Sequence, residues 1–237
     1  MNEIDQLITA YLPSDRATEL VRSTNITLLV GISGAGKDTI KKELLKKHDF
    51  RDIVSHTTRA PRVNNGVQEQ SDIDYHFIDG HAAKVMIENK EFIEAKFVHG
   101  TVYGTSVEEL QKSYDEQKIA ITDIDVQGVT EYKEMSQSVV AIFIIPPSYS
   151  IWRDRLAQRY ESIEAFEAEW IKRRNSAVSE LTHALEVPYY HFIINDDLGR
   201  AVAVAEEISH RPDIFLRKDD EARLRARDLL TAIQTSL

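Results

Sequence analysis

The apolar residues of the chain group into four nearly continuous runs, at 26–30, 119–124, 138–147 and 189–194. The runs are rich in β-branched residues and predict buried strands. Between them, apolar residues at helical spacing predict helices at 37–47, 126–136 and 198–209. Strands that alternate with helices and are buried on both faces pair in parallel. We therefore expect an α/β fold in which helices cover both faces of a parallel core sheet.

Residues 55–117 interrupt this rhythm, because their short strands alternate apolar and polar residues. The elements predicted here are a loop at 64–72, a strand at 74–78, a helix at 80–90, one or two strands at 92–106 and a helix at about 107–117. Such alternation is typical of antiparallel strands. We interpret this segment as a lobe inserted into the core. Further along, residues 148–184 are densely charged and predicted to be helical.

Both ends of the chain carry helical patterns of their own. Residues 1–12 have apolar residues at helical spacing, and a second short helix follows Pro13 and Ser14. We expect these two helices to pack on the core as an accessory. In the C-terminal segment, Leu230, Ile233 and Leu237 share one helical stripe. We predict that this helix docks on the N-terminal helices or on a second subunit.

Composition excludes several classes of function. The 237 residues suffice for one sizeable α/β core, and a net charge of -10 argues against a general binder of nucleic acid or anionic membranes. The chain has no cysteine, which rules out disulfides, thiolate metal sites and a cysteine nucleophile. No apolar run approaches the roughly 20 residues of a membrane span, and the acidic N-terminus is unlike a signal peptide. We therefore expect a cytoplasmic protein.

The strongest chemical signal is the stretch 26–39, ITLLVGISGAGKDT, which reads as a strand, a loop and a helix. Glycines at 31, 34 and 36 permit a wound backbone whose N–H groups point at an anion. The positive end of the following helix lies at the same place, and Lys37 adds a full charge. The pattern predicts a cradle for the phosphates of a nucleoside triphosphate.

This loop departs from the usual pattern at one position. Asp38 stands where a Ser or Thr normally follows the lysine, and Thr39 comes one residue later. The alternative interpretation is a glycine-rich turn with an exposed lysine. The strand before the loop and the helix after it favour the phosphate loop, in which Thr39 could supply the hydroxyl.

Two further groups of charged residues are candidates for phosphate chemistry. Arg59 and Arg62 flank Pro61, whose fixed backbone allows both guanidinium groups to be aimed at one target, although two solvated arginines are the alternative. Asp123 and Asp125 follow a buried strand. The carboxyl ends of such strands border the crevice where open α/β sheets bind ligands.

Residues 26–208 resemble the guanylate kinases. The matching segments, all in the order of that family, are GISGAGK, SHTTRAPR, DYHF, EFIEAKFVHGTVYGTS, DIDVQG, the arginine-bearing helices after residue 148 and IINDDL. The resemblance implies a P-loop NTPase fold of three layers with an inserted mixed α/β NMP-binding lobe, at about 55–117, and a helical lid, at about 148–177. The guanylate kinase-like domain would span 26–209, between helical extensions at 1–25 and 210–237.

The resemblance also implies a role for individual residues. Those expected to bind ATP are Gly31, Ser33, Gly34, Ala35, Gly36, Lys37, Asp38, Thr39, Asn195 and Asp196. Those expected to bind GMP are Ser55, Arg59, Arg62, Tyr75, Glu94, Tyr103, Thr105 and Asp125. Catalysis would depend on Lys37, Arg62, Arg159 and Arg173, and Mg²⁺ would lie near Thr39 and Asp123, held largely through water and phosphates.

The resembling family implies phosphorylation of GMP, and of dGMP, by ATP with Mg²⁺. We expect nucleotides as ligands, no nucleic acid or membrane partner, and a monomer or homodimer. Two alternatives remain open: a sugar-phosphate kinase resembling ribose 1,5-bisphosphate kinases, which carry a similar G-K-D-[ST] loop, and a non-catalytic module like the guanylate-kinase-like domains of scaffold proteins. Glu94 and the DIDVQG segment argue against the first, and the intact loop with Lys37 argues against the second.

Overall fold

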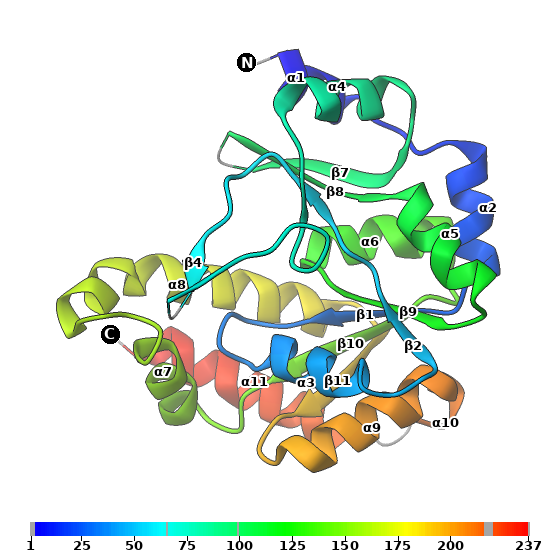
Figure 1. Ribbon diagram of the computed structural model, residues 1–237. Helices are drawn as coiled ribbons and strands as arrows, with labels where there is room; N and C mark the ends of the chain where they lie inside the picture. Colours follow the sequence, from blue (N-terminus) through cyan, green and yellow to red (C-terminus); the bar gives the residue numbers. More distant parts are fainter. Residues whose placement is uncertain (1–2, 65, 99, 216–219, 237) are drawn as a thin grey trace. The chain divides into compact units, whose positions relative to one another are not determined.

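The computed structural model describes residues 3–64, 66–98, 100–215 and 220–236 (Figure 1). The chain forms two compact units. The first unit consists of Met1–Ile26, His48–Thr122 and Glu131–Val139, and the second of Thr27–Lys47, Asp123–Thr130 and Val140–Leu237. Most residues expected to bind GMP belong to the first unit, and those expected to bind ATP belong to the second.

The second unit is built on parallel strands hydrogen-bonded in the order β11 (Tyr190–Ile194), β10 (Val140–Ile145) and β1 (Ile26–Val30). All six residues of β10 are buried, which confirms the buried strand predicted at 138–147. The helices of this unit are α3 (Lys37–Leu44), α7 (Tyr149–Ala157), α8 (Ile163–Glu186), α9 (Leu198–His210), α10 (Pro212–Phe215) and α11 (Asp220–Thr235). The predicted α/β class with a parallel sheet is therefore confirmed.

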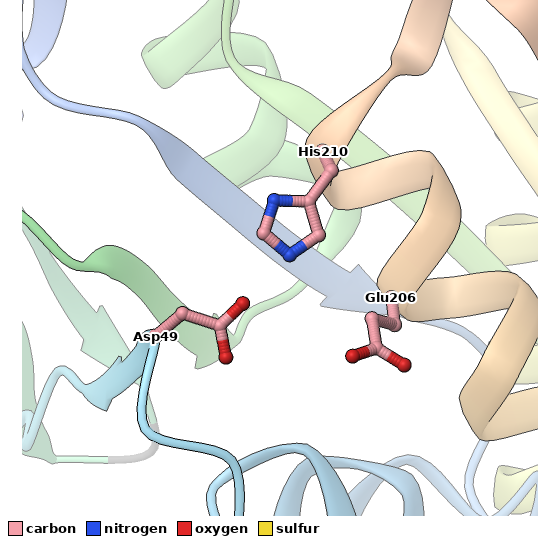
Figure 2. A group of neighbouring side chains, drawn as sticks. All are labelled: Asp49, Glu206 and His210. Carbon is pink, nitrogen blue, oxygen red and sulfur yellow. The ribbon is translucent and has the colours of Figure 1, made fainter.

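The helix α9 covers β10 and β11 and contacts α3. On α9, Glu206 and His210 lie one turn apart, and Glu206 forms an ion pair with Lys47 at 2.9 Å (Figure 2). Figure 2 also draws Asp49, which belongs to the first unit and precedes its strand β2 (Phe50–Asp52).

The first unit carries the inserted lobe. Its main sheet has the order β6 (His76–Phe77), β3 (His56–Thr57), β8 (Thr101–Ser106) and β7 (Phe92–Val98), in which β8 is antiparallel to both neighbours. The strand β2 pairs in parallel with β9 (Ile119–Asp123). The helices α4 (Gly80–Glu88) and α5 (Val107–Asp115) flank β7 and β8 in sequence, and α6 (Val126–Met135) follows β9.

The N-terminal helices α1 (Glu3–Thr9) and α2 (Asp15–Ser23) pack within the first unit, α1 against α4 and β7 (Figure 1). Apolar residues of α1 cover a cluster formed by Ile87, Phe92 and Ala95. Tyr11 donates from its hydroxyl to the carbonyl oxygen of Phe92 at 2.5 Å and accepts from the amide of Phe92 at 3.1 Å. Burial raises the pKa of this hydroxyl to about 12. The extension therefore stabilises the strand that carries Glu94.

The structure adds detail to three sequence predictions. Residues 148–184, predicted to be helical, form two helices, because the chain leaves α7 after residue 157 and Ser162 caps α8 by accepting from the amide of Ala165 at 3.2 Å. The loop predicted at 64–72 contains part of a short hairpin of β4 (Val63–Asn64) and β5 (Val67–Gln68), too short to show periodicity. Within its own unit the C-terminal helix packs on α8, β11 and α7, which was not predicted, and Leu237 lies outside the described residues. Its docking on the N-terminal helices or on a second subunit stays a prediction.

No helix in the part of the chain that the structure describes has the length and apolar character needed to span a membrane.

Candidate functional site

The loop between β1 and α3 is wound tightly around two glycines. A Cβ atom on Gly31 would lie 2.2 Å from the carbonyl oxygen of Ile144, and one on Gly36 would lie 2.2 Å from Nδ2 of Asn195. Gly36 also has a φ of +96°, which side chains disfavour. The neighbouring strands therefore require glycine at both positions, and the sequence was correct to place a loop of special conformation here.

Two side chains outside the loop hold its backbone carbonyls. Asn195 donates from Nδ2 to the carbonyl oxygen of Ala35 at 2.8 Å, and Trp152 of α7 donates from Nε1 to that of Ser33 at 2.8 Å. Both side chains are buried. The structure thus gives Asn195 a role in holding the loop, and its predicted contact with adenine stays a prediction.

The start of α3 supplies the features that an anion needs. Gly36 is the N-cap residue and provides no side-chain cap, so the first N–H groups of the helix have no partner from that residue. Lys37 extends back along the loop and donates from Nζ to the carbonyl oxygen of Gly31 at 2.5 Å. Asp38 and Thr39 are exposed in the first turn. The loop, the helix end and the lysine together form a phosphate cradle within one unit.

Asp123 and Asp125 lie beside the strand that leads into this loop, because the amide of Ile124 between them donates to the carbonyl oxygen of Leu29 at 3.1 Å. Asp123 forms an ion pair with Lys41 of α3 at 3.0 Å. Burial alone would raise the pKa of Asp123, but Lys41 and Lys37 outweigh it and lower the pKa. The carboxylate therefore stays ionised near the cradle.

This carboxylate and the hydroxyl of Thr39 are oxygen donors of the kind that Mg²⁺ takes alongside water and phosphates. The donor set therefore fits the metal that the resemblance implies. Asp125 is engaged differently, since its Oδ1 accepts from the amide of Gly128 at 2.7 Å at the start of α6.

The two arginines expected in the lid are exposed; Arg159 lies in the turn between α7 and α8, and Arg173 lies in α8. Nη1 of Arg159 lies 3.5 Å from the hydroxyl oxygen of Ser33, at the limit of a hydrogen bond to the phosphate loop. Arg173 donates from Nε to the hydroxyl of Tyr160 at 3.1 Å. Arg159 thus lies beside the phosphate loop. The approach of Arg159 and of Arg173 to a phosphate stays a prediction.

Glu180 of α8 is a charged residue of this region that sequence reasoning missed. Its carboxylate accepts from the hydroxyl of Ser176 at 2.8 Å, and Lys37, Asp125 and Arg173 are close enough to act on its charge. Burial raises the pKa of Glu180 despite the two cations.

In the first unit, Arg59 is held by a carboxylate that the sequence analysis did not single out. Glu69 accepts from Nη1 of Arg59 at 2.8 Å, from its Nη2 at 3.0 Å and from the backbone amide of Arg62 at 2.7 Å. The hydrogen bonds from Arg59 lower the pKa of Glu69, against the effect of burial. Both side chains of the ion pair are only 12% exposed, so the pair is shielded from solvent.

Aromatic rings complete the surroundings of Arg59. The guanidinium carbon lies 5.3 Å from the centroid of the Tyr75 ring, and this ring lies 6.2 Å from the ring of Tyr103. Three of the four residues predicted to hold the acceptor phosphate are therefore neighbours. The side chain of the fourth, Arg62, is exposed.

Glu94 lies in β7 and is 7% exposed. It is paired across the sheet with Thr105 of β8, which is 1% exposed. The side chains of such a pair lie on the same face of the sheet. Burial, together with the negative charge of Glu94, raises the pKa of Tyr132. Ser55 precedes β3, is partly exposed, and accepts from the amide of His76 through its carbonyl oxygen at 2.9 Å.

We predict that Glu69→Gln raises the KM for GMP by about three- to tenfold, because one charge-assisted hydrogen bond to Arg59 is weakened. Steady-state kinetics with varied GMP measures this effect. Glu88→Gln, at an exposed position of α4, is the matched control. An unchanged KM would show that Arg59 needs no orientation by Glu69.

No local sequence pattern distinguishes the residues that the sequence analysis missed. Glu69 lies in the polar stretch between two recognisable motifs. Trp152 and Glu180 lie on helices with many charged and apolar residues, any of which could have been a packing or surface residue. Only the spacing of Glu69, seven residues after Arg62, could have been noticed. Spacing without a known turn geometry does not identify an ion pair.

Comparison with known proteins agrees with this geometry. The guanylate kinase family model matches residues 23–211. A guanylate kinase of Clostridium perfringens is 37% identical over 185 residues, which cover 77% of this chain and 81% of the relative. One of Caldanaerobacter subterraneus is 35% identical over 206 residues, which cover 83% and 96%. The crystal structure of guanylate kinase from Anaplasma phagocytophilum matches with a TM-score of 0.57 at 27% identity, over 90% of this chain and 97% of that one. The chain belongs to the guanylate kinase family.

Proposed function

We propose that the protein transfers the γ-phosphoryl group of ATP to GMP, and to dGMP, and so supplies GDP and dGDP in purine nucleotide metabolism. The observation that carries this proposal is the complete phosphate loop, with Lys37 bonded across it, in a chain whose residues 23–211 match the family. A binding module that had lost catalysis would not need the lysine.

On the ATP side, the amides of the loop and of the first turn of α3 would bind the β- and γ-phosphates, and Lys37 would neutralise their charge. Asp196 would lie against the adenine, near Asn195. Asp196 is exposed and hydrogen-bonded to Arg200. Thr39 and Asp123 would hold Mg²⁺ through water and phosphate oxygens, and the metal would supply charge neutralisation at the transferring group.

On the GMP side, Arg59, Tyr75 and Tyr103 would bind the acceptor phosphate together with Arg62. Glu94 would accept hydrogen bonds from N1–H and the 2-amino group of guanine, while Thr105 and Ser55 would contact O6. Burial of Glu94 supports this assignment, since a buried carboxylate needs donors and guanine presents two adjacent ones. Asp125, which belongs to the second unit, would also bind GMP.

The chemistry requires electrostatic stabilisation more than acid–base catalysis. The phosphate of GMP is an oxyanion near neutral pH, so no strong general base is needed. In a loose phosphoryl transfer, charge collects on the three equatorial oxygens of the moving group. Lys37, Arg62, Arg159 and Arg173 would neutralise that charge. Exclusion of water when both nucleotides are bound would limit hydrolysis of ATP.

The proposal is tested by ADP release, measured with a coupled assay against GMP, AMP, UMP, CMP and ribose 1,5-bisphosphate. We expect GMP to be preferred over the other nucleotides. Preference for ribose 1,5-bisphosphate would favour the sugar-phosphate kinase, and no ADP with any acceptor would favour the binding module. The cytoplasmic location, the monomeric or homodimeric state and the absence of nucleic-acid or membrane partners stay predictions.

We predict that Arg159→Ala and Arg173→Ala each lower kcat by at least about tenfold, because their targets develop charge only in the transition state. The KM for GMP should change little. Arg153→Ala, at an exposed position of α7, is the control. If either variant instead raised the KM for GMP with kcat intact, the assignment of that arginine to the moving phosphoryl group would be wrong.

A further inference from the structure

The C-terminal helix α11 lies beyond residue 211, where the match to the family model ends. Its buried residues form one stripe at helical spacing, Ala222, Ala226, Leu229 and Ile233, each at most 8% exposed. The helix runs alongside α8 and also contacts β11 (Figure 1). On α8 the buried residues in its C-terminal half are Ala177, Leu181 and Ala184. The extension is thus packed into the second unit.

Arginines fasten this helix near both of its ends. Arg174 of α8 donates from Nε to the carbonyl oxygen of Ile233 at 2.8 Å and from Nη2 to that of Gln234 at 2.9 Å. The last carbonyls of a helix lack intrahelical donors and carry the negative end of its dipole, so a guanidinium there is stabilising. Near the other end, Nη2 of Arg223 lies 3.1 Å from the carbonyl oxygen of Tyr190, to which it donates.

The two halves of α8 differ in how they are held. From Arg174 onward, α8 is hydrogen-bonded to α11 through Arg174 and packs through its buried residues. Before that point, the helix contacts α7 and the turn after it through the ring pairs Trp170–Trp152 and Phe166–Tyr160 and through the ion pair of Glu167 with Arg153. Its outer face there is open to solvent, since Ile163 and Ile171 are 75% and 68% exposed. Arg173 is the residue immediately before the half of α8 that is bonded to α11. In the proposed function, Arg173 neutralises charge on the transferred phosphoryl group.

We propose that α11 is an anchor for the lid helix, and that Arg174 is a positioning residue that sets the place of Arg173 through it. A fixed backbone at Arg174 limits the positions that its neighbour can reach, and catalysis by a charged group depends steeply on such placement. The proposal rests on the proposed function only in the role of Arg173. The anchoring itself is independent of the reaction.

The test uses the full chain with Arg174→Ala, and Arg227→Ala as control at an exposed position of α11. We expect Arg174→Ala to lower kcat by about tenfold while the KM for GMP stays within about twofold. Arg174→Lys, which keeps one donor, should recover part of the loss. An unchanged kcat in a folded Arg174→Ala protein, or a rise in the KM for GMP alone, would overturn the proposal.

A second readout needs no activity. The sequence has two tryptophans, and both lie in the lid helices, Trp152 on α7 and Trp170 on α8. Fluorescence quenching by acrylamide therefore reports on these helices. We expect greater quenching in Arg174→Ala than in the parent or in Arg227→Ala. Equal quenching in all three would contradict the anchor. If the parent phosphorylated no GMP, the proposed function would fail while the quenching comparison still decided the anchoring.

Discussion

Replacement of Lys37 by Met should lower kcat at least about a hundredfold while the protein stays folded. The ammonium of Lys37 lies over the phosphate loop, 2.5 Å from the carbonyl oxygen of Gly31, where the β- and γ-phosphates would bind. Loss of one preorganised donor of this kind costs about 2.7–4 kcal/mol of transition-state stabilisation. Met keeps most of the length of the side chain, so packing around α3 should be preserved.

The control for this variant is Lys42→Met, at an exposed position of the same helix. It should retain the activity of the parent. Circular dichroism and thermal unfolding would establish that both variants are folded. Activity of Lys37→Met within about tenfold of the parent would contradict the assignment of the ATP site, because such a residue could not be neutralising the moving charge.

The second large effect concerns the choice of base. A carboxylate that accepts from N1–H and the 2-amino group of guanine faces an unprotonated N1 and no 2-amino group in adenine. The buried charge of Glu94 would then be unsatisfied, and discrimination of this kind reaches on the order of 10⁴. We therefore expect the parent enzyme to use GMP far better than AMP.

Glu94→Gln keeps the shape of the side chain but removes its charge. We predict that it lowers kcat/KM for GMP by at least about tenfold, the cost of one charged hydrogen bond. The ratio of kcat/KM for GMP to kcat/KM for AMP should also fall. Glu91→Gln, at an exposed position just before β7, is the control. A Glu94→Gln enzyme that kept its full preference for GMP would show that Glu94 is not the residue that reads the base.

The core of the fold could be predicted because its signals are local. Four apolar residues and Thr27 before Gly31, or six apolar residues within β10, leave little choice other than buried strands, and the glycines between β1 and α3 indicate an unusual backbone conformation. The order of motifs then pointed to the phosphate loop, Glu94 and Arg59. The structure brings Arg59, Tyr75 and Tyr103 together as the resemblance implied.

What could not be predicted depends on partners distant in the chain. Of the predicted C-terminal stripe, Ile233 is buried, Leu230 is half-buried and Leu237 lies outside the described residues. Nothing in the sequence identified α8 as the surface that α11 covers. In the sequence, Arg174 is one of several arginines on a charged helix. Only the structure shows that it donates to the carbonyl oxygens of Ile233 and Gln234. Likewise, the hydrogen bond from Trp152 to Ser33 forms only because α7 meets the phosphate loop, and no local sequence signal indicates that contact.

Transfer of label from ATP to GMP tests the central claim most directly. The parent protein would be incubated with ATP labelled in the γ-phosphate, Mg²⁺ and GMP, and the products separated. The account predicts that the label appears in the β-phosphate of GDP, that one ADP forms for each GDP, and that AMP in place of GMP yields little labelled ADP. Label found only in inorganic phosphate, or no GDP under conditions where ATP is bound, would contradict it.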